Sequence, residues 1–244
     1  MYVLPYILPV VAFLLGSIPF GLYIANSKGI DIRNAGSGNI GATNVFRVVG
    51  KKHGLICFFL DVLKGAVPVL LAVNLLGIEG KSPLTEFDFL ESLRTVYPSD
   101  KQTFIQAMQV LTGLCAVLGH NYSPWVGFKG GKGIATTAGV ILALMPIGFL
   151  ILIAFWALLT FTTRYVAVGS VAASIAFPLI VFWGANHHHV DNDKSLPSLW
   201  EAGTYNKPLL IFAIVAGTLA TWKHRANIKR LMNGTENRFG KKKS

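Results

Sequence analysis

A glycine-rich stretch from Gly36 to Asn44, followed by Arg47, contains residue types that suit an anion. It reads Gly-Ser-Gly-Asn-Ile-Gly-Ala-Thr-Asn, and such glycines let backbone N–H groups approach a ligand. The Arg47 guanidinium adds a fork of donors that matches phosphate. The spacing also fits a dinucleotide fingerprint, but no strand precedes it and Asp61 falls inside an apolar run, which excludes that interpretation. The stretch therefore predicts either an anion site or a flexible loop with helix caps.

A second polar stretch covers residues 119–121, Gly-His-Asn, and 127–133, Gly-Phe-Lys-Gly-Gly-Lys-Gly. It resembles a phosphate loop but lacks the Walker pattern, because Gly133 stands where Ser or Thr would hold magnesium. We expect it to bind an anion without ATP hydrolysis, through its backbone and one of its lysines, at Lys129, Gly130, Gly131 and Lys132. The alternative is a basic loop that lies on anionic lipid head groups.

A third polar stretch, His-Arg-Ala-Asn-Ile-Lys-Arg-Leu, begins at His224 directly after the last apolar run, and Glu236 follows it. If a helix continues here, His224 and Asn227 lie on one face, three residues apart. Histidine titrates near neutral pH, so His224 is the natural group to accept a hydroxyl proton. The alternative is a basic stretch that only anchors the chain at the membrane surface.

Charged residues inside an apolar run point to a supporting structure. Asp61 and Lys64 lie three residues apart in such a run, where unpaired charges are costly. We expect them to pair or to line a polar cavity, and to support the site structurally instead of taking part in catalysis. Ser170 follows Arg164-Tyr165 near the start of another apolar run and is a further candidate for substrate contact.

The elements that carry these residues are membrane helices. Of the 244 residues, 52% are hydrophobic and only 14% are charged, too few charges to cover a soluble domain of this length. The apolar residues form long runs, which predict one polytopic, all-α membrane domain over residues 1–244. Its seven segments are 4–25, 54–78, 104–119, 135–145, 147–163, 166–184 and 208–222.

The distribution of charge predicts the topology. Four connections (26–53, 119–134, residue 164 and 223–244) hold 16 Lys and Arg, against 5 in 79–103 and 185–207. Because basic connections stay cytoplasmic, the chain must turn near Pro146, with its amino terminus outside and its carboxyl terminus inside. Segment 135–145 is then a partial helix, too short to span. The net charge of +11 is a positive-inside signature, and we expect no nucleic-acid partner.

The three stretches in this order resemble the PlsY family, the acyl-phosphate-dependent glycerol-3-phosphate acyltransferases of bacterial membranes. The resemblance runs from Gly16-Ser17-Ile18-Pro19 to Glu236 and includes Asp61-Lys64-Gly65. It implies seven segments, an active site facing the cytoplasm at the cell (inner) membrane, and neither metal nor cofactor. The chain departs from the family in its long connections 79–103 and 185–207. It also has Val166-Ala167 where the family often has a serine, so Ser170 is our substitute.

The resemblance implies transfer of an acyl group from acyl phosphate to the 1-hydroxyl of glycerol 3-phosphate, giving lysophosphatidic acid and phosphate. Either His224 or an oxygen of a substrate phosphate takes the hydroxyl proton. The partners expected are therefore these two substrates and membrane lipids. The residues expected in catalysis are His224, Asn227, Arg47 and Ser37. Those expected to bind substrate are Gly38, Asn39, Thr43, Lys129, Gly130, Gly131, Lys132 and Ser170, and those expected to support the site are Asp61, Lys64 and Glu236.

The rival function from another class is a polytopic transporter of organic phosphates. A transporter should show paired halves with binding at the midplane, and the sequence has no such internal symmetry. Metal-dependent lipid phosphatases would need clustered carboxylates, whereas the expected inner face offers only Asp31 and Glu236. An inactive lipid scaffold would leave His224 and Asn227 unexplained.

Overall fold

The computed structural model of the chain is mostly helical and describes residues 3–83, 85–187 and 207–239. It divides into two compact units, Met1–Leu144 and Met145–Ser244, and each unit is described by itself. Most of the connection expected at 185–207, and the tail from residue 240 onward, lie outside the described residues. The expectation of a single domain over 1–244 stays a prediction.

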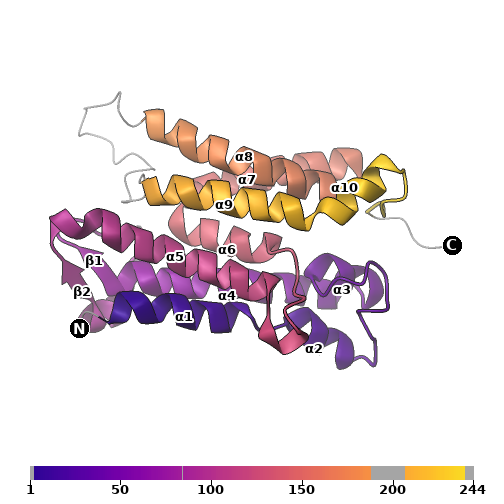
Figure 1. Cartoon of the computed structure of the whole chain (residues 1–244), viewed down its shortest axis with the longest axis horizontal. Helices are drawn as coiled ribbons and strands as arrows, with labels where there is room; N and C mark the ends of the chain where they lie inside the picture. Colours follow the sequence, from indigo (N-terminus) through magenta and orange to yellow (C-terminus); the bar gives the residue numbers. More distant parts are fainter. Residues whose placement is uncertain (1–2, 84, 188–206, 240–244) are drawn as a thin grey trace. The chain divides into compact units, whose positions relative to one another are not determined.

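Apolar helices packed side by side form the body of the first unit (Figure 1). They are α1 Leu4–Gly16, α4 Lys51–Leu75 and α5 Gln102–Asn121, with the shorter α6 Ile134–Leu144 along α4. Two short helices, α2 Phe20–Asn26 and α3 Ala42–Val48, lie at the end of the unit where α5 finishes (Figure 1). A 3-10 turn, Pro124–Val126, follows α5 at this end.

A small cap between α4 and α5 closes the opposite end of this unit. Strands β1 Leu76–Ile78 and β2 Thr95–Tyr97 pair in parallel, and 3-10 turns cover Asp88–Leu93 and Ser99–Lys101. Buried Asn74 fixes the turn after α4: its Oδ1 accepts from the Phe87 N–H (3.0 Å), and its Nδ2 donates to the Thr85 carbonyl (2.9 Å). The strands depart from the all-helical fold expected, because three residues are too few to show an alternating pattern beside an apolar run.

Glycines set the distance between the helices of the first unit. A Cβ at Gly65 would clash with the Thr136 backbone, and one at Gly139 would clash with the Val62 backbone. α4 and α6 therefore approach closely over both glycines. α1 and α5 do the same at Gly16 and Gly119. Small residues at helix contacts are typical of membrane proteins, where close van der Waals packing holds the helices together.

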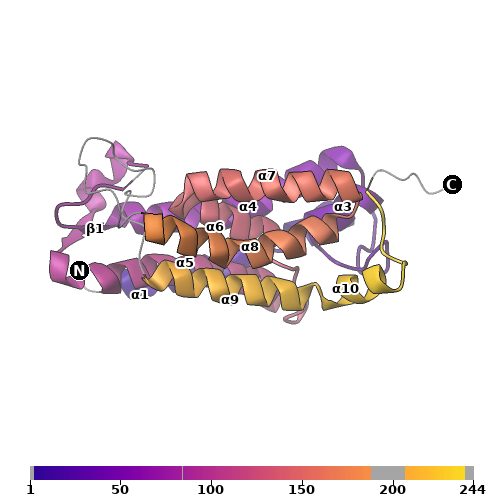
Figure 2. The ribbon, with the colours of Figure 1, turned by 90° about the horizontal axis from the view of Figure 1, so that it is seen from above.

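In the second unit α8 Val166–His187 packs against both α7 Pro146–Thr163 and α9 Lys207–Lys223 (Figure 2). After His224 the chain continues as α10 Arg225–Met232. The segment that follows α10 returns to the α7–α8 turn, where the Phe239 N–H donates to the Arg164 carbonyl (2.7 Å).

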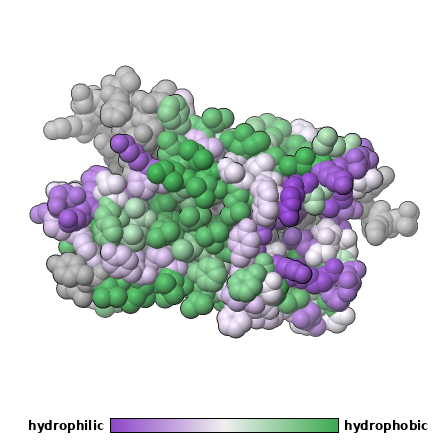
Figure 3. All heavy atoms as spheres, viewed as in Figure 1, coloured by the Kyte–Doolittle hydropathy of each residue, from purple (hydrophilic) through white to green (hydrophobic). Residues whose placement is uncertain are grey.

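Five helical stretches among the described residues are long and apolar enough to cross a membrane: Leu4–Asn26, Lys51–Leu75, Ser99–Val126, Pro146–Thr163 and Val166–Trp183. Hydrophobic residues cover the middle of α1 and α5, while hydrophilic residues gather at both ends of the first unit (Figure 3). Exposed side chains on α1, such as Val10 and Leu14, are apolar, as contact with lipid requires.

The predicted segments coincide with helices to within a few residues. α6 is a short apolar helix of 11 residues, and α7 begins at Pro146 as expected. The predicted segment 4–25 differs, because the chain breaks it at Ser17–Pro19 into α1 and α2. A multi-pass helical membrane fold follows from these helices, whereas the count of seven spans and the orientation of the termini stay predictions.

We expect Gly139→Ala to destabilise the first unit by about 1–3 kcal/mol, because the added methyl group forces α4 and α6 apart. The apparent melting temperature of the purified protein in detergent measures the effect. Leu142→Ala on the exposed side of α6 is the matched control and should change stability by no more than about 0.5 kcal/mol. Equal melting temperatures for Gly139→Ala and wild type would contradict the close packing.

Candidate functional site

The buried side chain of Asn44 organises the glycine loop, residues 36–41. Its Oδ1 accepts from the Ser37 N–H (2.9 Å), and its Nδ2 donates to the carbonyls of Ala35 (3.0 Å) and Asn39 (2.9 Å). Gly36 and Gly38 have positive φ angles, which glycine adopts without strain. The sequence therefore builds an internally hydrogen-bonded turn, in which one buried amide serves several backbone groups.

These internal bonds change how the loop can bind an anion. The N–H of Ser37 donates to Asn44, that of Gly38 to the Ala35 carbonyl (3.0 Å), and that of Gly41 to Asn39 Oδ1 (2.8 Å). The N–H groups of Ser37 and Gly38 are thus used within the loop in this conformation, and the assignment of Ser37 and Gly38 to substrate binding stays a prediction. Side chains take over that role in our hypothesis: the Ser37 hydroxyl, the Asn39 amide, and Thr43 and Arg47, both exposed on α3.

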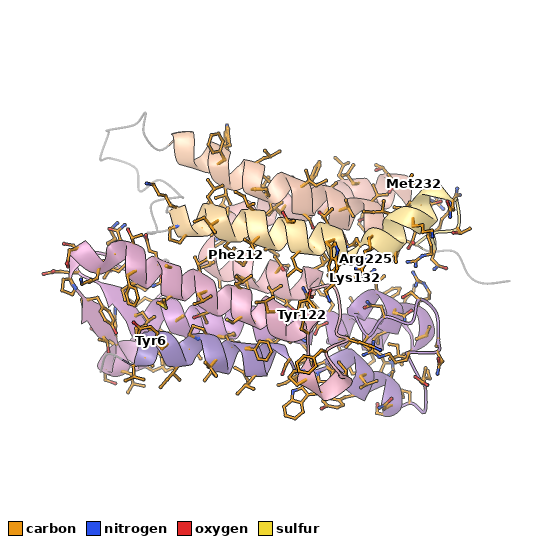
Figure 4. The ribbon with its side chains drawn as sticks, viewed as in Figure 1. Tyr6, Tyr122, Lys132, Phe212, Arg225 and Met232 are labelled. Carbon is orange, nitrogen blue, oxygen red and sulfur yellow. The ribbon has the colours of Figure 1, made fainter. Side chains whose placement is uncertain are left out.

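The lysine loop, residues 127–133, is attached to the end of α5. The N–H groups of Gly130 and Gly131 donate to the last carbonyls of α5, those of Asn121 (3.2 Å) and His120 (3.0 Å). A Cβ at Gly131 would fall on the imidazole ring of His120, so only glycine permits this contact. Figure 4 labels Lys132 in this loop, at the end of the unit where α5 finishes. Here too the glycines form the loop, and the positive charge comes from Lys129 and Lys132.

A direct hydrogen bond joins the two loop regions. The Arg33 guanidinium donates to the carbonyl of Lys129, across 96 residues of sequence. Asp31 holds the local turn by accepting from the Arg33 N–H (3.0 Å) and from Asn34 Nδ2 (2.7 Å). The glycine loop and the lysine loop therefore lie at the same end of the first unit. Arg33, Arg47, Lys129 and Lys132 give this end a positive charge that suits phosphate.

A polar cluster lies beneath the two loops, inside the helices. Lys64 Nζ is 2.7 Å from Asp61 Oδ1, and both side chains are buried. Lys64 also donates to the Ile18 carbonyl (2.8 Å) at the break between α1 and α2, and this carbonyl accepts from the Phe20 N–H (3.1 Å) as well. On the other side of the pair, His120 Nδ1 is 3.6 Å from Asp61 Oδ1. The two charges thus pair and also fix the groups around them.

A narrow crevice with both polar and apolar lining lies at the break at Ser17–Pro19. It is lined by this break, by Ile40 of the glycine loop and by the cluster residues Asp61, Lys64 and His120. Ser123 Oγ donates to the Ser17 carbonyl (2.6 Å), and Trp125 Nε1 donates to Ser17 Oγ (2.8 Å). The residues after α5 therefore satisfy the backbone that the broken helix exposes.

The third polar stretch is fixed within the second unit by Glu236. Its carboxylate accepts from Asn227 Nδ2 (2.9 Å) and from Arg230 Nε (2.7 Å), so the predicted supporting residue contacts a predicted site residue. In the same segment Arg238 donates to the Tyr165 hydroxyl (3.0 Å), and this hydrogen bond raises the pKa of the guanidinium. The segment after α10 is thereby held against the α7–α8 turn.

The His224 ring has a defined orientation. Its Nδ1 is 2.8 Å from the Ala220 carbonyl oxygen, which can only accept a hydrogen bond. Nδ1 therefore carries the proton, and in the neutral ring Nε2 is the nitrogen with the lone pair. A histidine held in this tautomer can accept a proton at Nε2, or donate from Nε2 once it is charged.

Ser170 occupies a different kind of position. Its Oγ accepts from Trp156 Nε1 (3.2 Å) where α7 and α8 pack, and the side chain is buried. This geometry gives Ser170 a packing role, and its contact with substrate stays a prediction.

Sequence reasoning missed residues whose importance depends on long-range contacts. The sequence patterns give Arg33 only a role in topology, and they place Asn44 and His120 in motifs without assigning either a role of its own. The signal for Asn44 was its place at the end of the glycine stretch, where a buried amide can serve several backbone groups. The structure brings the first two stretches together in one unit, and the third stretch lies in the other.

We expect Asn44→Asp to loosen the glycine loop, because the substituted oxygen would face carbonyl oxygens that now accept from Nδ2. Loss of these buried hydrogen bonds should destabilise the protein by about 1–3 kcal/mol. Hydrogen exchange of residues 35–45, followed by mass spectrometry, should accelerate. Asn26→Asp, at an exposed position on α2, is the control and should leave exchange unchanged. Unchanged protection of residues 35–45 from hydrogen exchange in Asn44→Asp would contradict the proposed role of the Asn44 side chain.

Comparisons of this chain with known proteins all point to one family. A family model described as glycerol-3-phosphate acyltransferase matches residues 6–234. The chain is 40% identical over 232 residues to the glycerol-3-phosphate acyltransferase of Aquifex aeolicus, with 95% of this chain and 97% of that protein covered. It is 37% identical to the enzyme of Chlorobium phaeobacteroides, with 94% of both covered.

Solved structures agree with these relatives. A crystal structure of PlsY, an integral membrane glycerol 3-phosphate acyltransferase in its glycerol 3-phosphate form, is 38% identical with a TM-score of 0.74. It covers 97% of this chain, and this chain covers 96% of it. The lysophosphatidic acid form is 37% identical, with a TM-score of 0.71 and covered shares of 97% and 95%. The chain therefore belongs to the PlsY family of integral membrane glycerol-3-phosphate acyltransferases.

Proposed function

We propose that this protein transfers a fatty acyl group from acyl phosphate to the 1-hydroxyl of glycerol 3-phosphate. The products are lysophosphatidic acid and phosphate, so the reaction opens phospholipid synthesis. The observation that carries this proposal is the match over nearly the whole chain to PlsY, whose solved structures are described as glycerol 3-phosphate and lysophosphatidic acid forms. These two molecules are the acceptor and the acylated product of the proposed reaction.

The chemistry needs no cofactor. The hydroxyl oxygen attacks the carbonyl carbon of acyl phosphate, a C–O bond forms, and the bond between that carbon and the phosphate oxygen breaks. The hydroxyl proton passes to a base and phosphate leaves. Because the donor is already activated, positioning and charge stabilisation supply most of the acceleration. An end of the first unit that carries Arg33, Arg47, Lys129 and Lys132 supports binding of phosphate.

The role of each side chain in the proposed reaction is assigned from its chemical type. Lys132, with the side chains of Ser37 and Asn39, binds substrate phosphate, and Lys129 and Thr43 add further donors. Arg47 and Asn227 bind glycerol 3-phosphate. His224 takes the hydroxyl proton at Nε2, a role that its bond from Nδ1 to Ala220 supports. Asp61, Lys64 and Glu236 hold these groups in place.

We place the enzyme in a bacterial cell membrane, with the active site facing the cytoplasm. Seven segments, counting α6 as a partial helix and α9 as a span, put both basic loops and the basic tail on the inner side. The unequal distribution of Lys and Arg between the connections supports this orientation.

The donor can be tested directly. Purified protein with labelled glycerol 3-phosphate should form lysophosphatidic acid with acyl phosphate, and not with acyl-CoA or acyl carrier protein. A chelator should leave the rate unchanged, because the proposed reaction uses no divalent metal. Turnover with acyl-CoA alone would reject the proposed donor, and a loss in chelator that magnesium restores would reject the metal-free mechanism.

Cysteine labelling in intact cells tests the orientation. In a background with both native cysteines replaced by alanine, Ser195→Cys should react with an impermeant maleimide and Ser244→Cys should not. After the cells are permeabilised, Ser244→Cys should react as well, which controls for its reactivity. Labelling of Ser244→Cys from outside would invert the topology and the proposed cytoplasmic site.

We expect His224→Ala to lower kcat by about a hundredfold or more, the usual effect of losing a general base. His224→Gln separates two roles, because its amide can replace a hydrogen bond near Nε2 but cannot accept the proton. If His224 is the base, the glutamine variant should be as slow as the alanine variant. Recovery of most of the rate by His224→Gln would show instead that the histidine only donates a hydrogen bond.

The pH profile of the same variants gives an independent readout. A base must be neutral to act, so kcat of the wild type should fall as the pH drops through the range where histidine titrates. A substrate phosphate also titrates near pH 6, so the comparison must include the variant. The acid limb should disappear in His224→Ala, and an unchanged limb would assign the base to the substrate phosphate.

A further inference from the structure

We propose that the buried Asp61–Lys64 pair is a positioning device for the lysine loop, and that it acts through His120. The proposal rests on the proposed function, because it concerns how Lys132 meets substrate phosphate. It goes beyond structural support in general, since it specifies one route of contacts from the membrane interior to one loop.

The route begins at Asp61, which pairs with Lys64 and lies near His120. Its Oδ1 lies 2.7 Å from Lys64 Nζ and 3.6 Å from His120 Nδ1. All three side chains are buried, where attraction between charges is stronger than in water. Lys64 is itself fixed by the Ile18 carbonyl (2.8 Å) and by the Phe20 ring, whose centroid lies 5.5 Å away. The carboxylate therefore has a defined place relative to α1, α2 and α4.

The next step connects His120 to the lysine loop. The Gly131 backbone packs so closely on the imidazole ring that a Cβ there would overlap it, and the Gly131 N–H donates to the His120 carbonyl (3.0 Å). The ring thus presses on the residue that precedes Lys132. A rotation of His120 away from Asp61 would leave that backbone without its support, and Lys132 would shift with it.

The geometry explains why a costly pair lies inside a membrane helix. Removal of one partner from a buried pair leaves an uncompensated charge, so such a pair persists where its position matters. Asp61 lies one side chain away from the lysine loop, whereas buried Asn74, at the other end of α4, bonds to nearby backbone groups of Leu70, Thr85 and Phe87. α4 therefore contains one buried polar residue, Asp61, that belongs to the proposed route, and another, Asn74, that does not and can serve as a control.

The test uses steady-state kinetics of the full-length protein, with both substrates varied. Lys132→Ala first identifies the phosphate substrate whose KM depends on the loop. Asp61→Asn should raise the KM of that same substrate about tenfold, within the range of couplings between residues in contact, with less than about threefold change in kcat. His120→Gln should do the same. Asp61→Glu, which keeps the carboxylate, should recover part of the loss.

A double-mutant cycle separates positioning from general stability. Because Asp61 and His120 act along one route, Asp61→Asn combined with His120→Gln should raise KM no further than either change alone. Asn74→Ala is the control: it should lower the melting temperature and leave KM unchanged. Additive effects of the two changes, or a normal KM in folded Asp61→Asn, would overturn the proposal.

A second variant covers a failure to fold. Asp61→Asn with Lys64→Met removes both charges, so no unpaired charge stays buried, and the KM should still rise because His120 has lost its carboxylate. A wild-type KM in this double variant would show that the Asp61–Lys64 pair is only structural. If the double variant also fails to fold, an unchanged KM in His120→Gln would contradict the proposal. The proposed function itself fails only if the wild type transfers no acyl group in the same assay.

Discussion

Lipid offers no hydrogen bond to an open backbone group, and this constraint accounts for the arrangement of the first unit. The chain breaks its first membrane helix at Ser17–Pro19, which exposes carbonyls that a continuous helix would have used. Lys64 takes the Ile18 carbonyl and Ser123 takes that of Ser17, at 2.8 and 2.6 Å. An unpaired lysine would be costly at this depth, so Asp61 must stand beside it. Both the ion pair and the segment after α5 are therefore required by a single interruption of α1 and α2.

The same interruption contributes to bringing the first two polar stretches together within the first unit. The glycine loop follows α2 along the chain. Ser123 and Trp125, which precede the lysine loop, hydrogen-bond to Ser17 at the break. The two loops then need only one direct contact, from Arg33 to the Lys129 carbonyl, to lie side by side. Asn44 and the capped end of α5 keep each loop rigid, because their backbone N–H groups are used internally. The proposed function therefore assigns anion binding to long, charged side chains such as Lys132 and Arg47.

Apolar runs predicted the helices well, because a membrane span must be both apolar and helical for physical reasons that act locally. Pro146 was likewise a local signal, and α7 begins there. The break at Ser17–Pro19 was missed because its compensation comes from Lys64 and Ser123, far away in sequence. Asn44 and Arg33 were missed for the same reason: residue type revealed that they were polar, but not which carbonyls they would meet. The strands at Leu76–Ile78 and Thr95–Tyr97 depend on a pairing across 19 residues that no local pattern records.

Rigid loops suit the proposed chemistry for a further reason. Acyl phosphate carries its own leaving group, so the protein has little bond-making chemistry to supply and must mainly hold two phosphate-bearing molecules in reacting geometry. Flexible lysines on a loose loop would attract phosphate without fixing where the carbonyl carbon lies. In the lysine loop, glycine N–H groups bond to the end of α5, and the backbone packs on buried His120. The backbone of the lysine is therefore fixed, and only its side chain can move. The position of the lysine loop then depends on polar residues within the membrane helices. The buried Asp61–Lys64 pair and the interrupted helix therefore contribute to substrate binding through the loops that they support.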